Sequence, residues 1–238
     1  MAAFASLGGS EIHPSCWDKC IAVLTELGHE SKTIDWVMAP WADGQLAAVE
    51  YLSRELNGLD GAILVGHSLA GIFLPLLGYR INAKREIYIA ALASGPEHSL
   101  SDRLFAGEEI LEFAWIATYE GMALSLNQSP SGDQIACIQN YLFHDCPSSS
   151  FAAYWRPLSL PLNLFYESRL SLTESHIPRN YIVCTRDRTI RPEWQRKIAL
   201  EISGAHAPPT EFASGHCPQI AKPYELAHLI DALAEQQA

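Results

Sequence analysis

The chain has 238 residues, of which 48% are hydrophobic and 18% are charged, and its formal net charge is −11. This composition excludes a disordered or low-complexity chain and predicts a single domain with a sizeable buried core. The negative charge and the scattered lysines and arginines argue against nucleic acid or an anionic membrane surface as a partner.

The sequence was also searched for apolar membrane spans, for an N-terminal leader and for cysteine spacings typical of disulfides or metal sites. No stretch approaches the roughly 18 consecutive apolar residues of a membrane span, and the start from Met1 to Gly9 has neither a basic leader nor a long apolar core. We therefore expect a cytoplasmic protein. The six cysteines show no C-x-x-C pair and no regular framework spacing, which predicts free thiols, no metal site and no cofactor.

Helical and strand-like patterns alternate along the chain. Apolar residues at helical spacing predict helices over 18–27 and 44–56. Short apolar runs predict buried strands at 62–65, 86–92 and 180–184. Strands separated by helices imply an α/β fold with a doubly wound, mostly parallel sheet, whose ligands bind beyond the carboxyl ends of the strands.

The alternation is lost between about residues 96 and 176, where aromatic residues are frequent and prolines interrupt the helical pattern. We interpret 96–176 as a helical lid inserted into a core formed by 1–95 and 177–238. Most lid aromatics are expected to pack against one another. The candidates for a substrate pocket are Gly9, Trp115, Tyr119 and Phe143.

A nucleophile elbow is the strongest local motif. It follows the predicted strand at 62–65 and reads Gly66-His67-Ser68-Leu69-Ala70-Gly71. A serine between a strand and a helix, flanked by small residues, is typical of such an elbow because the turn is strained. Ala70 stands where the G-x-S-x-G pattern has its last glycine, so a serine in an ordinary glycine-rich turn is the alternative.

A serine nucleophile needs a histidine base that is itself oriented by a carboxylate. Proteins with this elbow carry the three residues in the order serine, acid, histidine. Asp187 lies just beyond a predicted strand, and His216 precedes a last helix predicted over 223–234. Glu97 and Asp102 are the alternative acids.

The same chemistry needs two backbone N–H donors for the oxyanion. Leu69, directly after the serine, is one candidate. Ser10 in the Gly8-Gly9-Ser10 loop is the other, although this glycine pair is also consistent with a plain turn.

With these residues the chain resembles the branch of the α/β-hydrolase superfamily that contains plant methyl esterases, hydroxynitrile lyases and bacterial pyrethroid-type carboxylesterases. The resemblance covers nearly the whole chain and rests on Cys16-Trp17 with the helix to Gly28-His29-Glu30, Ile63 to Gly71, Ala90-Ala91-Leu92-Ala93 with Pro96, Tyr181 to Asp187 with Ile190 and Gln195, Gly215-His216 and Lys222-Pro223. It implies the α/β-hydrolase fold with a lid. Hydroxynitrile lyases of this type carry a threonine in the early loop and a lysine after the histidine, where this chain has Gly9 and Cys217, so the resemblance implies an esterase rather than a lyase.

We therefore predict a serine hydrolase that cleaves a small to medium, largely apolar carboxylic ester through an acyl-enzyme. The aromatic lid offers no basic cluster to hold a charged acid. The alternatives are a lyase, a lactonase, a ligand-binding protein with little turnover and, less strongly, a chain shortened at its start. The sequence leaves the oligomeric state open, a homodimer included.

Overall fold

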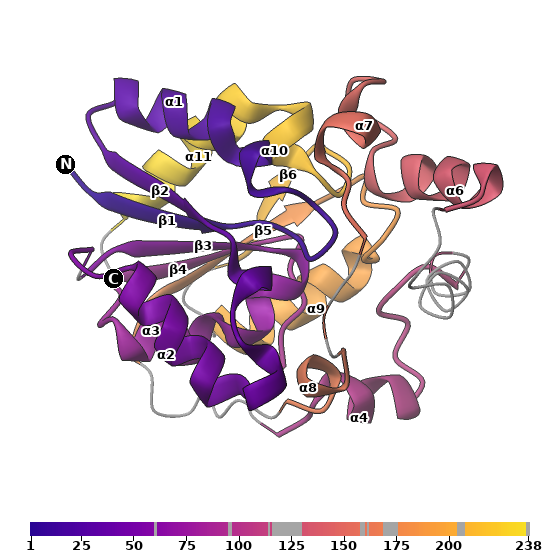
Figure 1. Ribbon diagram of the computed structural model, residues 1–238, viewed down its shortest axis with the longest axis horizontal. Helices are drawn as coiled ribbons and strands as arrows, with labels where there is room; N and C mark the ends of the chain where they lie inside the picture. The colour runs from indigo at the N-terminus through magenta and orange to yellow at the C-terminus, as the bar shows by residue number, and fades with distance from the viewer. Residues whose placement is uncertain are drawn as a thin grey trace.

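The computed structural model describes residues 1–59, 61–94, 97–113, 115, 130–157, 160, 162–168, 176–203 and 208–236. Its centre is a sheet in the order β2-β1-β3-β4-β5-β6, with every neighbouring pair parallel (Figure 1). This confirms the predicted parallel sheet. The strands are β1 (Ala3–Leu7), β2 (Glu30–Ile34), β3 (Ile63–His67), β4 (Arg85–Ile89), β5 (Arg179–Cys184) and β6 (Thr210–Phe212).

Helices cover both faces of the sheet (Figure 1). One face carries α1 (Asp18–Glu26), α10 (Pro218–Ala221) and α11 (Pro223–Ala234), and the other carries α2 (Gln45–Glu55), α3 (Leu74–Arg80) and α9 (Pro192–Ser203). The predicted helices over 18–27, 44–56 and 223–234 correspond to α1, α2 and α11 within one residue at each end. The sheet is therefore doubly wound, as the alternating pattern predicted.

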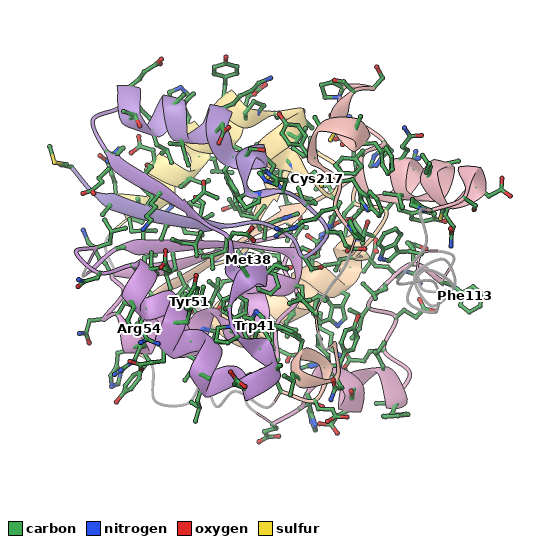
Figure 2. All side chains as sticks on the ribbon, in the orientation of Figure 1. Met38, Trp41, Tyr51, Arg54, Phe113 and Cys217 are labelled. Atoms are coloured by element: carbon green, nitrogen blue, oxygen red, sulfur yellow. The ribbon has the colours of Figure 1, made fainter. Side chains whose placement is uncertain are left out.

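The two faces follow from side-chain alternation along each buried strand. In β5, Tyr181 and Val183 pack toward α9, whereas Ile182 and Cys184 pack toward the opposite helical layer. Figure 2 shows Trp41 in the layer of α2 and α3, and Cys217 in the layer of α10 and α11. Each face thus has its own hydrophobic core.

Two of the predicted strands end at other residues in the structure. β3 continues past Val65 through Gly66 and His67 into the elbow. β4 ends at Ile89 rather than at Leu92, because Ala90 takes a left-handed conformation with φ of 41° and leaves the strand.

Several short helices lie between β4 and β5, in the region interpreted as a lid. The described ones are α4 (Leu100–Phe105), α6 (Gly132–Leu142), α7 (Ser150–Tyr154) and α8 (Leu162–Tyr166). Ser99 caps α4 and Ser131 caps α6, each in a capping box that fixes where the helix begins. In Figure 1 this group lies beside the carboxyl ends of the strands.

Short 3-10 helices connect several of these elements. They are η1 (Pro14–Trp17), η2 (Trp36–Met38), η3 (Trp41–Asp43) and η4 (Ser68–Phe73). Among the described residues, no helix combines the length and the apolar character needed to cross a membrane.

Candidate active site

The elbow joins β3 to η4 and places Ser68 in a left-handed turn with φ of 57°. Such a conformation is costly for a residue with a side chain, and it turns the serine out of the strand. A Cβ atom on Gly66 would lie 2.5 Å from Leu74 Cδ1, and one on Gly71 would lie 2.4 Å from the Leu92 carbonyl oxygen. The close approach to the segment that follows β4 therefore falls on Gly71, which is consistent with Ala70 filling the last glycine position of the motif.

Three polar side chains meet at the carboxyl edge of the sheet. Ser68 Oγ lies 3.0 Å from His216 Nε2, and His216 Nδ1 lies 2.9 Å from Asp187 Oδ2. His216 and Asp187 are 1% and 5% exposed. These two contacts fit an imidazole that donates from Nδ1 to Asp187 and accepts at Nε2 from the serine hydroxyl.

Asp187 is held in place by four hydrogen bonds. Its Oδ1 accepts from the backbone N–H groups of Thr189 and Ile190, at 2.7 and 3.1 Å, and its Oδ2 accepts from Gln195 Nε2 as well as from His216. Gln195 is itself fixed, because its Oε1 accepts from the Cys184 backbone N–H at 2.9 Å. The carboxylate has one orientation available, directed at the imidazole.

The loop that carries His216 is fixed from two sides. His67 Nε2 donates to the His216 carbonyl at 2.7 Å, and His67 Nδ1 accepts from Gln219 Nε2 at 3.3 Å. Burial lowers the pKa of His67 well below its usual range, and the nearby His216 lowers it further, so the ring is neutral. On the other side, Asp145 accepts hydrogen bonds from Ser214 Oγ and the Gly215 N–H.

The early loop after β1 brings Ser10 and Glu11 to the same cavity as Ser68. Trp36 Nε1 donates to the Gly8 carbonyl at 2.6 Å and so fixes the start of this loop. The backbone N–H of Arg156 donates to the Glu11 carbonyl at 2.8 Å, and that of His13 donates to the Tyr154 carbonyl at 2.7 Å. The early loop is therefore tied to the segment that follows α7.

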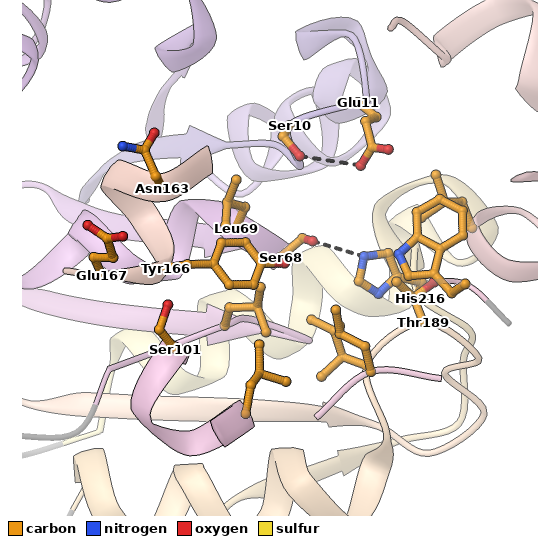
Figure 3. A pocket seen from close by; sticks show the side chains of 16 residues that line it. Ser10, Glu11, Ser68, Leu69, Ser101, Asn163, Tyr166, Glu167, Thr189 and His216 are labelled. Carbon is orange, nitrogen blue, oxygen red and sulfur yellow. Dashed lines mark hydrogen bonds between the residues drawn. The ribbon is translucent and has the colours of Figure 1, made fainter. Parts of the chain in front are cut away.

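These groups open into one cavity of about 410 Å³ (Figure 3). Ser68, Leu69, Ser10 and His216 all line it, so the two predicted oxyanion donors belong to residues on the same cavity as the serine. The remaining lining residues are Glu11, Leu92, Ser101, Leu104, Leu111, Trp115, Leu142, Asn163, Tyr166, Glu167, Thr189 and Ile190.

The model of the Alpha/beta hydrolase family matches residues 6–229. The chain belongs to this family. The family resemblance inferred from the sequence is thereby confirmed, and the sheet, elbow and cavity described above are those of an α/β hydrolase.

Among characterised relatives, Methylesterase 1 of Arabidopsis thaliana is 23% identical over 93% of this chain and 91% of its own length. Among solved structures, a pyrethroid hydrolase from Sphingobium faniae JZ-2 has a TM-score of 0.74 at 17% identity, over 98% of this chain and 97% of its own. Polyneuridine aldehyde esterase has a TM-score of 0.75 at 18% identity, over 99% and 100% of the two chains. At these identities the structural likeness shows the shared fold.

The predicted pocket residues of this α/β hydrolase fall in different places. Trp115 lines the cavity, and Tyr119 lies outside the described residues. Gly9 lies behind the cavity wall, where an added Cβ would be 3.2 Å from His67 Nδ1. The prediction that Phe143 lines the substrate pocket was wrong. Phe143 follows the end of α6, packs into the core beside α1 and α11, and borders a separate hollow.

The alternative acids lie away from Ser68 in the fold. Asp102 accepts hydrogen bonds from Ser99 and completes the capping box of α4, and Glu97 is exposed. Cys217, beside the histidine, is fully buried, and burial raises the pKa of its thiol well above the usual range. The thiol therefore adds no charge next to His216. Among the described residues, no group of three side chains is arranged to hold a metal ion.

Sequence reasoning missed Glu11, a carboxyl group in the wall of the cavity. It is 9% exposed, and Ser10 Oγ donates to its Oε2 at 3.3 Å. Burial raises the pKa of Glu11 to about 7, while His216 and the Ser10 hydroxyl act in the opposite direction. The signal in the sequence was an acidic residue directly after the predicted oxyanion donor, but nothing in the spacing indicated that it is buried.

Proposed function

We propose that this α/β hydrolase is a serine esterase that cleaves small to medium, largely apolar carboxylic esters through an acyl-enzyme. The observation that carries the proposal is the chain of hydrogen bonds from Ser68 through His216 to Asp187, with the serine in a strained turn facing a cavity.

The chemistry follows from these contacts. His216 Nε2 takes the proton of Ser68 Oγ as this oxygen attacks the ester carbonyl, and Asp187 stabilises the imidazolium that forms. The backbone N–H groups of Leu69 and Ser10 are the proposed donors to the oxyanion. His216 then returns the proton to the leaving alcohol, and a water activated by the same nitrogen hydrolyses the acyl-enzyme.

The lining of the cavity supports an ester of moderate size. Leucine, isoleucine and aromatic side chains provide most of its wall, and its volume lies in the range of small-molecule sites. No lysine or arginine is among its described lining residues, so the described wall offers an anionic substrate no cationic partner.

Turnover of p-nitrophenyl acetate and p-nitrophenyl butyrate tests the proposal with the wild type, Ser68→Ala and His216→Ala. Each variant should lose about a thousandfold or more in kcat, as removal of a member of such a triad predicts. Ser101→Ala, a second serine in the wall of the cavity, and His228→Ala, an exposed histidine of α11, are the matched controls and should retain activity.

Retained folding is checked by circular dichroism and melting temperature. If the folded wild type hydrolyses neither ester faster than Ser68→Ala does, the esterase proposal is wrong. Covalent labelling of Ser68 by a fluorophosphonate would then separate an enzyme with another reaction from a ligand-binding protein. A substrate panel with lactones and cyanohydrins separates the lactonase and lyase alternatives in the same way.

A further inference from the structure

The cavity beside Ser68 carries acidic side chains and, among its described lining residues, no basic one apart from His216. The carboxyl groups among its described lining residues belong to Glu11 and Glu167. Figure 3 shows them at opposite ends, with Glu11 at the end of His216 and Glu167 beside Tyr166. Glu167 is exposed, so solvent screens its charge, whereas Glu11 is buried.

Glu11 has no cationic partner among the described residues. The nearby Arg156 donates only its backbone N–H to the Glu11 carbonyl, and its guanidinium forms a two-bond ion pair with Asp35, at 2.8 and 2.9 Å. The Ser10 hydroxyl is the one hydrogen-bond donor that the described structure offers to the Glu11 carboxyl. A buried carboxylate without a cation is unusual, because its charge is costly in a poorly solvated place.

The groups that face Glu11 do not supply that cation. His216 lies close enough to affect its charge, but its Nδ1 is paired with Asp187. Tyr166 of α8 is neutral, since burial raises the pKa of its hydroxyl to about 12 and the Glu11 carboxyl raises it in the same direction. Among the described residues, no group that faces Glu11 therefore provides a cation for its carboxylate.

Aromatic rings line the same cavity. Trp115 and Tyr166 both contribute to its wall together with aliphatic side chains. The faces of such rings attract ammonium groups, and methyl groups on the nitrogen fit an apolar wall. A carboxylate together with aromatic rings is the combination that recognises a substituted ammonium ion.

We propose that Glu11 binds a cationic group of the substrate and makes the site selective for esters that carry an ammonium group. This inference rests on the proposed esterase function and narrows its substrate class. Ser68 and His216 would hold the scissile ester, and Glu11, at the same end of the cavity as His216 (Figure 3), would be the positioning group for the charged part of the molecule.

The ionisation of Glu11 gives the proposal a pH dependence. The cation binds the ionised carboxylate, so binding strengthens as pH rises through the pKa of about 7, and a proton is released when binding occurs below it. The Glu11→Gln variant retains His216, so comparison with it isolates the part of the pH dependence of binding that is due to Glu11.

Paired esters that differ only in charge provide the first test. Butyrylcholine and 3,3-dimethylbutyl butyrate have the same shape, but the first has a quaternary nitrogen where the second has a carbon. At pH 8 the wild type should favour butyrylcholine in kcat/KM by about tenfold or more. Glu11→Gln should lower this ratio to about one, and the matched control Glu167→Gln should change it by less than about threefold.

A binding measurement that needs no turnover provides the second test. Isothermal titration calorimetry compares choline with 3,3-dimethylbutan-1-ol in the wild type, Glu11→Gln and Glu167→Gln. Choline should bind the wild type more tightly than the neutral alcohol does, with a dissociation constant that falls as pH rises from 5 through the Glu11 pKa of about 7 and levels off above it. Titrations at pH 6 in phosphate and in imidazole buffer report the released proton, and both effects should shrink in Glu11→Gln.

The two tests separate the two proposals. Choline binding that depends on Glu11, in a protein that hydrolyses no ester, would leave the cation site standing and overturn the esterase. Ester hydrolysis in which Glu11→Gln keeps the wild-type charge preference, or in which the wild type favours the neutral ester, would overturn the cation site and leave the esterase standing.

Discussion

The two sides of Ser68 are built differently. On the His216 side, Asp187 and Gln195 are buried and hydrogen-bonded to each other, and His216 is held at both its ring and its backbone. On the Ser10 side, the backbone is tied down, but the Glu11 carboxyl has a single hydrogen bond among the described residues. In the proposed mechanism the first side provides one fixed proton path, whereas the second side provides the carboxyl group for the proposed cation.

The largest expected effect comes from a substitution on the His216 side, where the polar groups are hydrogen-bonded to one another. Asp187→Asn presents an amide to two donors, His216 Nδ1 and Gln195 Nε2, and so disfavours the productive tautomer of the imidazole. We expect kcat for p-nitrophenyl butyrate to fall by about 10⁴, or about 5 kcal/mol of transition-state stabilisation. The exposed Asp133→Asn is the control, and a loss below tenfold in folded Asp187→Asn would contradict the role given to this carboxylate.

The next effect concerns the Ser10 side, where the ionisation of Glu11 changes the free energy of unfolding of the protein. The pKa of Glu11 is about 7 in the folded protein against an ordinary value of 4.5, so the unfolded chain loses its proton first as pH rises. The wild type therefore loses stability between about pH 4.5 and pH 7, by on the order of 3 kcal/mol in total. Glu11→Gln should remove this loss.

Urea unfolding of the wild type and Glu11→Gln at pH 5 and pH 8 measures the difference. The variant should gain stability relative to the wild type at pH 8 and gain much less at pH 5. An equal difference at both values would show that the folded and unfolded states ionise alike. The same substitution at the exposed Glu167 serves as the comparison.

A smaller effect is expected from Gln195, which is hydrogen-bonded to Asp187 on the His216 side. Gln195→Met keeps the side-chain volume but leaves the buried Cys184 N–H without its acceptor and Asp187 without one donor. We expect a loss of about 2 kcal/mol in unfolding free energy. Activity should fall about tenfold, because Asp187 is then less firmly oriented. Urea denaturation and kcat, measured on one preparation, check the loss of stability and the loss of activity. An unchanged kcat would contradict the role of Gln195 in orienting Asp187.

The smallest effect concerns the backbone of the early loop. Trp36 Nε1 donates to the Gly8 carbonyl, while Trp41 Nε1 donates to the Trp36 carbonyl in the same aromatic cluster. Trp36→Phe and Trp41→Phe should both lower the melting temperature. Only Trp36→Phe should also lower kcat/KM, by several-fold or about 1 kcal/mol, and equal kinetics in the two variants would exclude a role of this bond in positioning the loop.

Much of the sheet was predictable because its central strands are continuous apolar runs. The strand predicted at 180–184 from such a run is β5, and the helix predicted at 223–234 is α11. The first two strands were not predicted. β2 lies at the edge of the sheet with alternately exposed residues, and its Glu-Ser-Lys-Thr-Ile sequence lacks the apolar signal of a buried strand.

The candidate site was predictable where chain order follows the sheet. Ser68, Asp187 and His216 each come after a strand, and parallel strands bring their carboxyl ends to one edge. Glu11 and Phe143 were not predictable in this way, because their environments depend on how the segments between β4 and β5 fold back over the sheet. No local pattern shows that Phe143 turns into the core while a glutamate turns into the cavity.

The backbone hydrogen bonds from Arg156 to Glu11 and from His13 to Tyr154 join the early loop to the segment that follows α7. A ligand that displaces this segment must also move the loop that bears Ser10. The coupling is reciprocal, because any free energy by which occupation of one place favours the other is returned in the opposite direction. The position of the segment after α7 and the position of Ser10, the proposed oxyanion donor, are thereby linked through two backbone hydrogen bonds.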